Sequence, residues 1–85
     1  MTHMCPVCGF KQMPFPPEDH NICPSCGTEF GYHDRTLSHE ALRKRWIASG
    51  ARWFSTAMKP PVGWNPYDQM LSAGLVDAPP AAQKI

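Results

Sequence analysis

The sequence of 85 residues lacks any apolar run close to the roughly 18 residues that a membrane-spanning helix needs. Residues 1–6 have neither the basic start nor the apolar stretch of a secretory signal. The chain also lacks a nucleophile spaced with a histidine and a carboxylate in a recognisable catalytic pattern. We therefore expect a cytoplasmic protein that is not an enzyme and does not bind membranes.

The chain is also short of material for a hydrophobic core. Chains of this size bury only about 60% of the surface that their unfolded form exposes, so they often depend on a disulfide, a metal or a partner. The length leaves no room for two cores, and the 10 prolines favour loops and short elements. We expect one small domain that needs an additional source of stability.

Four cysteines supply that source, as two Cys-x2-Cys pairs formed by Cys5 with Cys8 and by Cys23 with Cys26. The turn within such a pair directs both sulfurs to one ion, and a second pair completes the tetrahedron that zinc prefers. The 14 residues between Cys8 and Cys23 are close to the roughly 15 to 20 of the usual four-cysteine pattern. The spacing alone leaves open a redox pair, which needs a βαβ setting, and two disulfides, which need an oxidising compartment.

We expect these four cysteines to hold one structural Zn²⁺. Because zinc binding supplies about 10 to 16 kcal/mol to small peptides, residues 1–32 should unfold without the metal. All four positions around the ion are filled by protein, which disfavours zinc-dependent hydrolysis.

The residues around the cysteines form two similar units, CPVCGF and CPSCGT, each with a glycine where the chain turns under the metal. These units resemble the zinc-ribbon and rubredoxin-like group, in which CPxCG knuckles at the tips of two short hairpins hold one ion. The aromatic and acidic residues 30–34 also make the sequence similar to small bacterial cysteine-rich proteins of unassigned function. A rubredoxin ends soon after its second knuckle, whereas 59 residues follow Cys26 here. Iron stays an alternative to zinc, because it accepts the same four ligands.

Short strands are expected after each knuckle, around residues 10–13 and 29–32, and a helical pattern begins near Ser38. Ser38 or Thr36 is the candidate N-cap. At 100° per residue, one broad face of this helix carries large apolar side chains together with a histidine and a glycine. That face comprises His39, Leu42, Trp46, Ile47, Gly50, Trp53 and Phe54. Gly50 either ends the first part of the helix or allows another element to approach closely.

A second, shorter helix is expected after the two adjacent prolines at 60–61, which exclude helix there. Asn65 followed by Pro66 is typical of an N-cap and the first helical position, and Gly74 is a typical stop. The pattern as a whole predicts a small α+β domain stabilised by metal. It comprises zinc-ribbon (rubredoxin-like) β-hairpins over residues 1–34, a helical extension over 35–74 that packs on the ribbon, and a mobile tail over 75–85.

The formal net charge of +1 becomes about −1 once a divalent ion holds four thiolates. Bases concentrate in residues 35–52, and the polar side of the helix carries Lys44, Arg45 and Arg52. These three bases could contact phosphates. However, the isoelectric point of the chain is 7.7, whereas nucleic-acid-binding domains typically have an isoelectric point above about 9.

The large rings Trp46, Trp53, Phe54 and Trp64 are expected to form the core that joins the helix to the ribbon. The alternative is that some of them are exposed as a partner surface, for which the candidate residues are Lys44, Arg45, Arg52, Trp53 and Trp64. The four histidines are expected to lie at the surface or at edges.

Three functions are compatible with these observations. We favour a non-enzymatic zinc ribbon that interacts with an unknown protein partner or with its own copy. The alternatives are a rubredoxin-like iron electron carrier and a zinc ribbon that binds nucleic acid through the basic helix.

Overall fold

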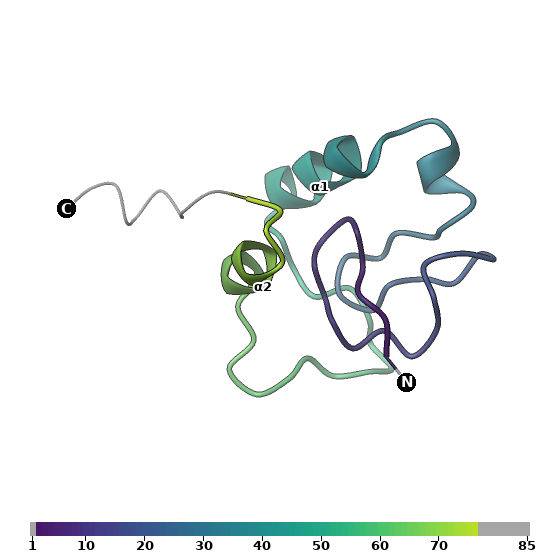
Figure 1. The fold of residues 1–85 in the computed structure, drawn as a ribbon. Helices are drawn as coiled ribbons and strands as arrows, with labels where there is room; N and C mark the ends of the chain where they lie inside the picture. The colour runs from purple at the N-terminus through teal and green to yellow at the C-terminus, as the bar shows by residue number, and fades with distance from the viewer. Residues whose placement is uncertain (1, 77–85) are drawn as a thin grey trace.

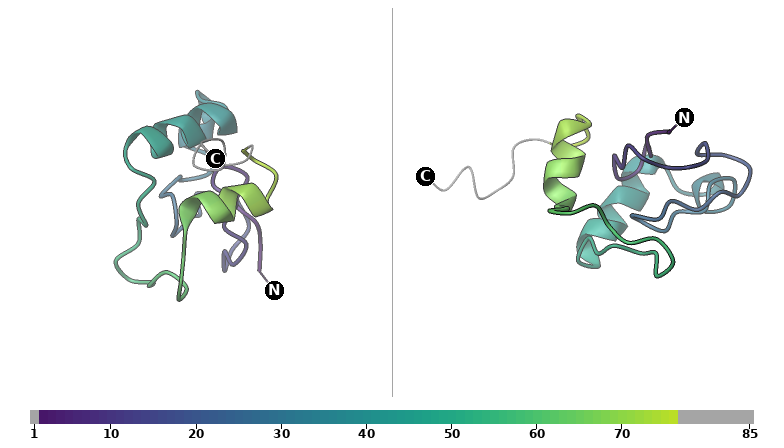
Figure 2. Two further views of the ribbon diagram at one scale, coloured as in Figure 1. Left: turned by 90° about the vertical axis from the view of Figure 1, so that its left-hand side faces the viewer. Right: turned by 90° about the horizontal axis from the view of Figure 1, so that it is seen from below.

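The structure, a computed structural model, describes residues 2–76. It contains a short 3₁₀ helix, η1 (His33–Arg35), and two α-helices, α1 (His39–Ala48) and α2 (Pro66–Ser72). The cysteine-bearing loops of the first half lie together on one side, and α1 and α2 lie against them as separate segments (Figures 1 and 2). No helix in this part of the chain is both long and apolar enough to span a membrane. The tail predicted to be mobile lies outside the described residues from position 77 onwards.

The β-hairpins expected around the knuckles are not found among residues 2–76. Only two isolated antiparallel bridges occur there, one between His3 and Met13 and one between Ile22 and Glu29. Four prolines, at positions 14, 16, 17 and 24, have no N–H to extend a ladder. After Glu29 the chain turns at once, because the amides of residues 32 and 33 both donate to the Glu29 carbonyl. The first half is therefore built from loops held by local hydrogen bonds rather than from strands.

Helix α1 begins as predicted, with Ser38 and not Thr36 as its N-cap. The Ser38 hydroxyl accepts a hydrogen bond from the Ala41 amide at 3.0 Å. The helix ends at Ala48, well before Phe54, through the hydrogen bonds of a Schellman motif. The amide of Gly50, which has φ of +110°, donates to Ile47, and that of Ala51 donates to Trp46. Of the two roles predicted for Gly50, the structure shows the first.

Helix α2 confirms the predicted start and stop. The Asn65 side-chain oxygen accepts from the amides of Tyr67 and Asp68 at 2.9 and 3.0 Å, and Pro66 occupies the first turn. At the other end the Gly74 amide donates to Leu71. The main-chain amides of the first turn, which have no partner within the helix, thus bond to a side chain whose capping role is visible in the sequence.

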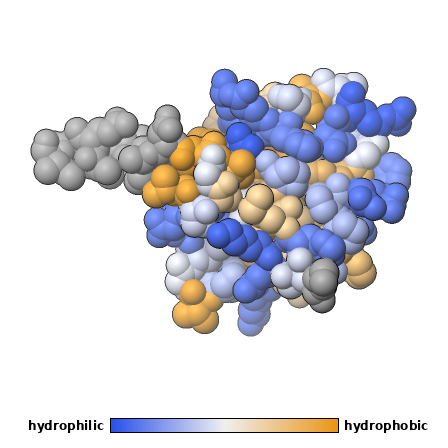
Figure 3. Space-filling view, viewed as in Figure 1, coloured by the Kyte–Doolittle hydropathy of each residue, from blue (hydrophilic) through white to orange (hydrophobic). Residues whose placement is uncertain are grey.

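One hydrophobic core joins the cysteine-bearing loops to both helices. Its buried members are Cys5, Val7, Cys8, Phe10, Met13, Cys23, Phe30, Leu42, Trp46, Ala51 and Met70. The Trp53 ring packs edge-on against Phe10 at 5.2 Å and against Trp64 at 5.3 Å. Phe54, in contrast, is 57% exposed, so its predicted place in the core is wrong. Hydrophilic side chains cover most of the face in Figure 3, where hydrophobic ones form separate small groups.

Candidate metal centre

The structure brings the four cysteine sulfurs together at distances that suit one tetrahedral ion. All four Sγ atoms lie within 4.8 Å of one another. Cys5 and Cys26 are 3.8 Å apart and Cys8 and Cys23 are 3.7 Å apart. Four zinc–sulfur bonds of about 2.3 Å in a regular tetrahedron place the sulfurs about 3.8 Å from each other. The cysteines are free thiols, so the disulfide alternative is not the arrangement seen, and the cluster can hold a metal ion.

Burial and the closeness of the four sulfurs disfavour four negative charges in the cluster unless a cation is present. Cys5, Cys8 and Cys23 are fully buried. The contacts with Cys26 and then with Cys5 raise the pKa of the Cys23 thiol, and burial adds to this effect. The contact with Cys23 in turn lowers the pKa of Cys26. The sulfurs therefore cannot all carry negative charge by themselves, whereas a divalent ion at their centre stabilises every one of them as a thiolate.

Each cysteine pair lies on a tight turn, and we call residues 5–9 the first knuckle and residues 23–27 the second knuckle. The amides of Gly9 and Gly27 donate to the carbonyls of Cys5 and Cys23, both at 2.8 Å. These two glycines have φ of +84° and +79°, as their predicted role in the turn requires. A Cβ on Gly27 would also lie only 2.5 Å from the ring of Phe54.

Two side chains from the helices hold the first knuckle by its main-chain carbonyls. The Arg43 guanidinium, from α1, donates to Val7 O at 2.7 Å and to Pro6 O at 2.9 Å. The Gln69 side-chain amide, from α2, donates to Cys8 O at 3.0 Å. Three consecutive carbonyls of this knuckle are thereby bound to residues at least 36 positions further along the chain.

The second knuckle is held in a similar way from the segment that connects the helices. The amides of Phe54 and Ser55 donate to Ser25 O at 3.1 Å and to Pro24 O at 2.9 Å. Gln69 reaches this knuckle too, because its Nε2 lies 3.1 Å from Ser25 Oγ, while its Oε1 accepts from the Trp64 indole at 2.7 Å. One glutamine therefore connects α2, both knuckles and the tryptophan cluster, which is formed by Trp46, Trp53 and Trp64.

Sequence reasoning missed the roles of Arg43 and Gln69 around the cluster. In the sequence, Arg43 is one of several bases in residues 35–52, and Gln69 belongs to no pattern. The atoms that they bind include main-chain carbonyls, which every residue possesses. No side-chain pattern at the knuckles could therefore have pointed to these two residues.

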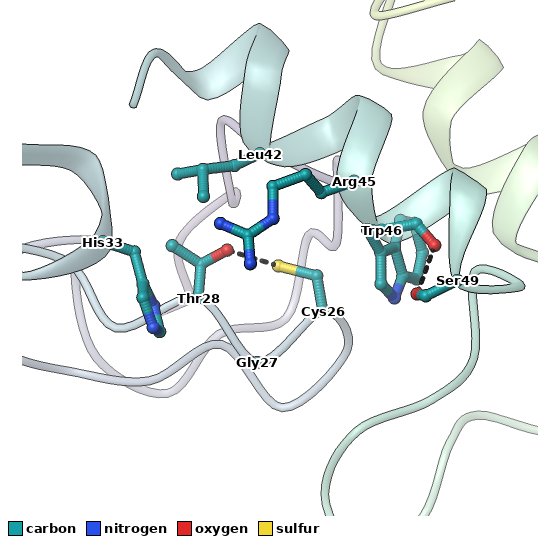
Figure 4. Close-up of a pocket in the computed structure, with 8 residues that line it drawn as sticks. All are labelled: Cys26, Gly27, Thr28, His33, Leu42, Arg45, Trp46 and Ser49. Atoms are coloured by element: carbon teal, nitrogen blue, oxygen red, sulfur yellow. Dashed lines mark hydrogen bonds between the residues drawn. The ribbon is translucent and has the colours of Figure 1, made fainter. Parts of the chain in front are cut away.

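The structure does not place the candidate partner residues on one helix face. Arg52 follows the end of α1, and the Lys44 ammonium lies 3.8 Å from the Glu40 carboxylate. Trp53 and Trp64 are half-buried in the tryptophan cluster. Arg45 extends from α1 towards the second knuckle, over a pocket of about 310 Å³ that reaches Cys26 (Figure 4).

The histidines lie outside the cysteine cluster found among residues 2–76. His39 is exposed, and its Nε2 lies 3.5 Å from the Asp34 carboxylate. The ring of His33 accepts a hydrogen bond at Nδ1 from the Glu29 amide at 2.9 Å.

Comparisons of the chain with protein-family models, with curated proteins and with solved structures found no match. The cluster is therefore interpreted from its own chemistry, which is that of a four-cysteine site able to hold a metal ion.

Proposed function

We propose that this chain is a non-enzymatic zinc-binding protein of the zinc-ribbon kind, in which one structural Zn²⁺ holds a surface that interacts with a partner protein. The observation that carries the proposal is the tetrahedral spacing of the four sulfurs. Cys5, Cys8, Cys23 and Cys26 would be the ligands, and the ion would supply free energy of folding.

A structural role follows from how the ligand set is closed. Four cysteines fill a tetrahedral site, so no coordination position is left for water or a substrate. The knuckles also serve as the anchor for later parts of the chain, since Arg43, Phe54, Ser55 and Gln69 all bind their carbonyls or side chains. An ion that fixes the knuckles would thereby fix the surface formed by residues 35–74.

Elemental analysis of protein purified without added metal tests the first part. We expect one equivalent of zinc per chain and no visible colour. Removal of the zinc by a chelator should abolish the far-ultraviolet circular dichroism and the tryptophan fluorescence of the folded chain, and addition of zinc should restore both signals. A chain that keeps its fold after complete metal removal would contradict the structural role.

Replacement of Cys26 gives a matched pair of variants, because this ligand is only half-buried and borders the pocket shown in Figure 4. Cys26→His supplies a nitrogen atom, which zinc accepts as a ligand in place of sulfur, whereas Cys26→Ser supplies a hydroxyl that binds zinc poorly. We expect Cys26→His to retain zinc and Cys26→Ser to lose most of it. Equal retention by both variants would show that Cys26 is not a ligand.

A rubredoxin-like electron carrier is the second candidate, favoured by one observation. Cys26 is the least buried of the four cysteines and opens onto a pocket, and an exposed ligand is where an electron could enter such a site. Ferric iron bound by four thiolates absorbs visible light and zinc does not. A coloured native preparation with one equivalent of iron would therefore replace the zinc proposal by this one.

The interaction role is tested separately from the metal. Crosslinking and sedimentation of the zinc-loaded chain should reveal either a protein partner or self-association through residues 35–74. A strictly monomeric chain that crosslinks to no protein in its native cell extract would count against this part of the proposal and leave the metal site unaffected.

A further inference from the structure

Two neighbouring pockets, which together we call the groove, lie between α1 and residues 26–37. The first has a volume of about 310 Å³ and the second about 560 Å³. The groove is defined by the residues that line them: Cys26, Gly27, Thr28, Tyr32, His33, Arg35, Thr36, Leu37, Leu42, Arg45, Trp46 and Ser49. His33 and Arg45 belong to both pockets. Volumes in this range suit a few side chains of a peptide rather than a single small ion.

The groove is rich in unpaired hydrogen-bond donors of positive charge. Arg35 and Arg45 have no ion-pair or hydrogen-bond partner for their guanidinium groups among the residues that the structure describes. No carboxylate belongs to the described lining residues of either pocket. Because the Nδ1 atom of His33 accepts a hydrogen bond from a main-chain amide, its Nε2 is left as a further donor. A carboxylate would satisfy these groups.

The two ends of the groove differ in character. The first pocket has apolar walls from Leu42 and Trp46, and it reaches Cys26 (Figure 4). A divalent ion together with the four thiolates that hold it would carry a charge of about −2, which would repel an anion from this end. The second pocket contains Arg35 and Thr36, which are not part of the first. Negative charge therefore suits the Arg35 end and an apolar side chain suits the Trp46 end.

We infer that this groove binds an acidic peptide segment of a protein partner, with a carboxylate between Arg35 and Arg45 and a neighbouring apolar side chain against Leu42 and Trp46. The inference rests on the proposed interaction role and adds the chemical class of the segment that the partner would present. Arginine binds carboxylates through two parallel hydrogen bonds, which gives direction as well as attraction.

A nucleic-acid strand fits this region less well. Its phosphates would extend beyond the groove, and the two segments that flank the groove carry the exposed or half-buried carboxylates of Glu29, Asp34 and Glu40. The metal centre adds further negative charge next to Cys26. The observations thus favour a short acidic segment over a continuous polyanion.

The test uses the full chain loaded with zinc and nuclear magnetic resonance titration with end-blocked tetrapeptides. Two probes carry leucine and aspartate as neighbours between terminal glycines, one in each order, and two controls carry asparagine in place of aspartate. We expect at least one aspartate probe to shift signals of residues 33–46 with a Kd on the order of 1 mM. Its asparagine counterpart should bind about tenfold more weakly, because it cannot form the charged contact.

Variants locate the binding. Arg35→Gln and Arg45→Gln should each weaken binding of the aspartate probe about fivefold or more. Lys59→Gln is the control, since it removes an exposed base that lines neither pocket, and it should leave the affinity unchanged. Equal loss in all three variants would show non-specific attraction and overturn the inference.

Three further outcomes would also overturn it: no shifts from any probe, equal binding of aspartate and asparagine probes, or tighter binding of a single-stranded hexanucleotide than of the peptides. Zinc content is measured in the same samples, which separates this inference from the proposed function. A fully loaded, folded chain without peptide binding refutes the groove alone, whereas a folded chain without metal refutes the structural zinc.

Discussion

Gln69 is the residue whose loss should reveal most about how the helices depend on the knuckles. Its amide nitrogen donates to Cys8 O at 3.0 Å and lies 3.1 Å from Ser25 Oγ, and its oxygen accepts from the Trp64 indole at 2.7 Å. Gln69→Ala removes all three contacts but leaves α2 with a residue of high helix propensity. The effect of the substitution therefore comes from the lost contacts rather than from the helix itself.

The size of the effect follows from the burial of the groups left behind. Each hydrogen bond contributes about 0.5 to 1.5 kcal/mol net, so three contribute about 1.5 to 4.5 kcal/mol. Cys8 and Ser25 are fully buried, whereas Trp64 is only half-buried, so water can replace the contact to its indole. We expect a loss of about 2 to 3 kcal/mol, from a total stability of about 4 to 11 kcal/mol for a domain of this size.

Urea unfolding of the zinc-loaded chain, followed by tryptophan fluorescence at a fixed free zinc concentration, measures this loss. With a slope of about 1 kcal/mol per molar urea, typical of a small protein, the midpoint should fall by about 2 to 3 M. Gln12→Ala is the matched control, because Gln12 is exposed and its replacement should move the midpoint by less than about 0.5 M. A Gln69→Ala midpoint as close to the parent value as that of the control would refute the reasoning.

Two further predictions concern Gly27 in the second knuckle and Asp34 in η1, just before α1. Gly27→Ala should destabilise the fold by about 2 to 4 kcal/mol, because the new Cβ would lie 2.5 Å from the Phe54 ring at a φ of +79°. Gly63→Ala is the control, because it has a similar φ of +73° but open space around the new Cβ, and it should cost only about 1 kcal/mol. Equal urea midpoints for Gly27→Ala and Gly63→Ala would contradict the steric argument. The Gly31 amide, followed by the contact with His39, holds the pKa of Asp34 below its ordinary value of 3.8. Its stabilising contribution is therefore full above that value and is lost as the pH falls through the lowered one, so Asp34→Asn should be less stable at pH 7 and its deficit should shrink in acid. Carboxyl carbon titration of Asp34 by magnetic resonance tests the cause, and a pKa at or above 3.8 would show it to be wrong.

Features of the fold that depend on neighbouring residues could be predicted from the sequence. The cysteine spacing indicated a common cluster, and the four sulfurs lie within 4.8 Å of one another. The sequence indicates Asn65 and either Ser38 or Thr36 as N-caps, and in the structure the side-chain oxygens of Ser38 and Asn65 accept from amides two or three residues later. Such signals are contained within one turn of chain, so no knowledge of tertiary structure is needed to find them.

Features that depend on competing local signals or on distant residues could not be predicted in this way. The apolar pattern continued to Phe54, but α1 ends at Ala48 because the Schellman motif at Gly50 overrides the periodicity. The expected hairpins are reduced to isolated bridges, because prolines and the turn after Glu29 limit each pairing to a few hydrogen bonds. The groove between α1 and residues 26–37 was not foreseen either, because Arg35 and Arg45 line the same pocket only after the chain has folded.

The attachment of the knuckles through main-chain oxygens has a consequence for how this sequence can vary. Pro6, Val7, Cys8, Pro24 and Ser25 each offer a carbonyl to a later segment, and any replacement residue would offer the same atom. The donors at Arg43 and Gln69, in contrast, depend on the shape of their side chains. A library that randomises both sides should therefore accept more residues at the half-buried Pro6 than at positions 43 and 69, so that the restrictive positions lie far from the motif that they support.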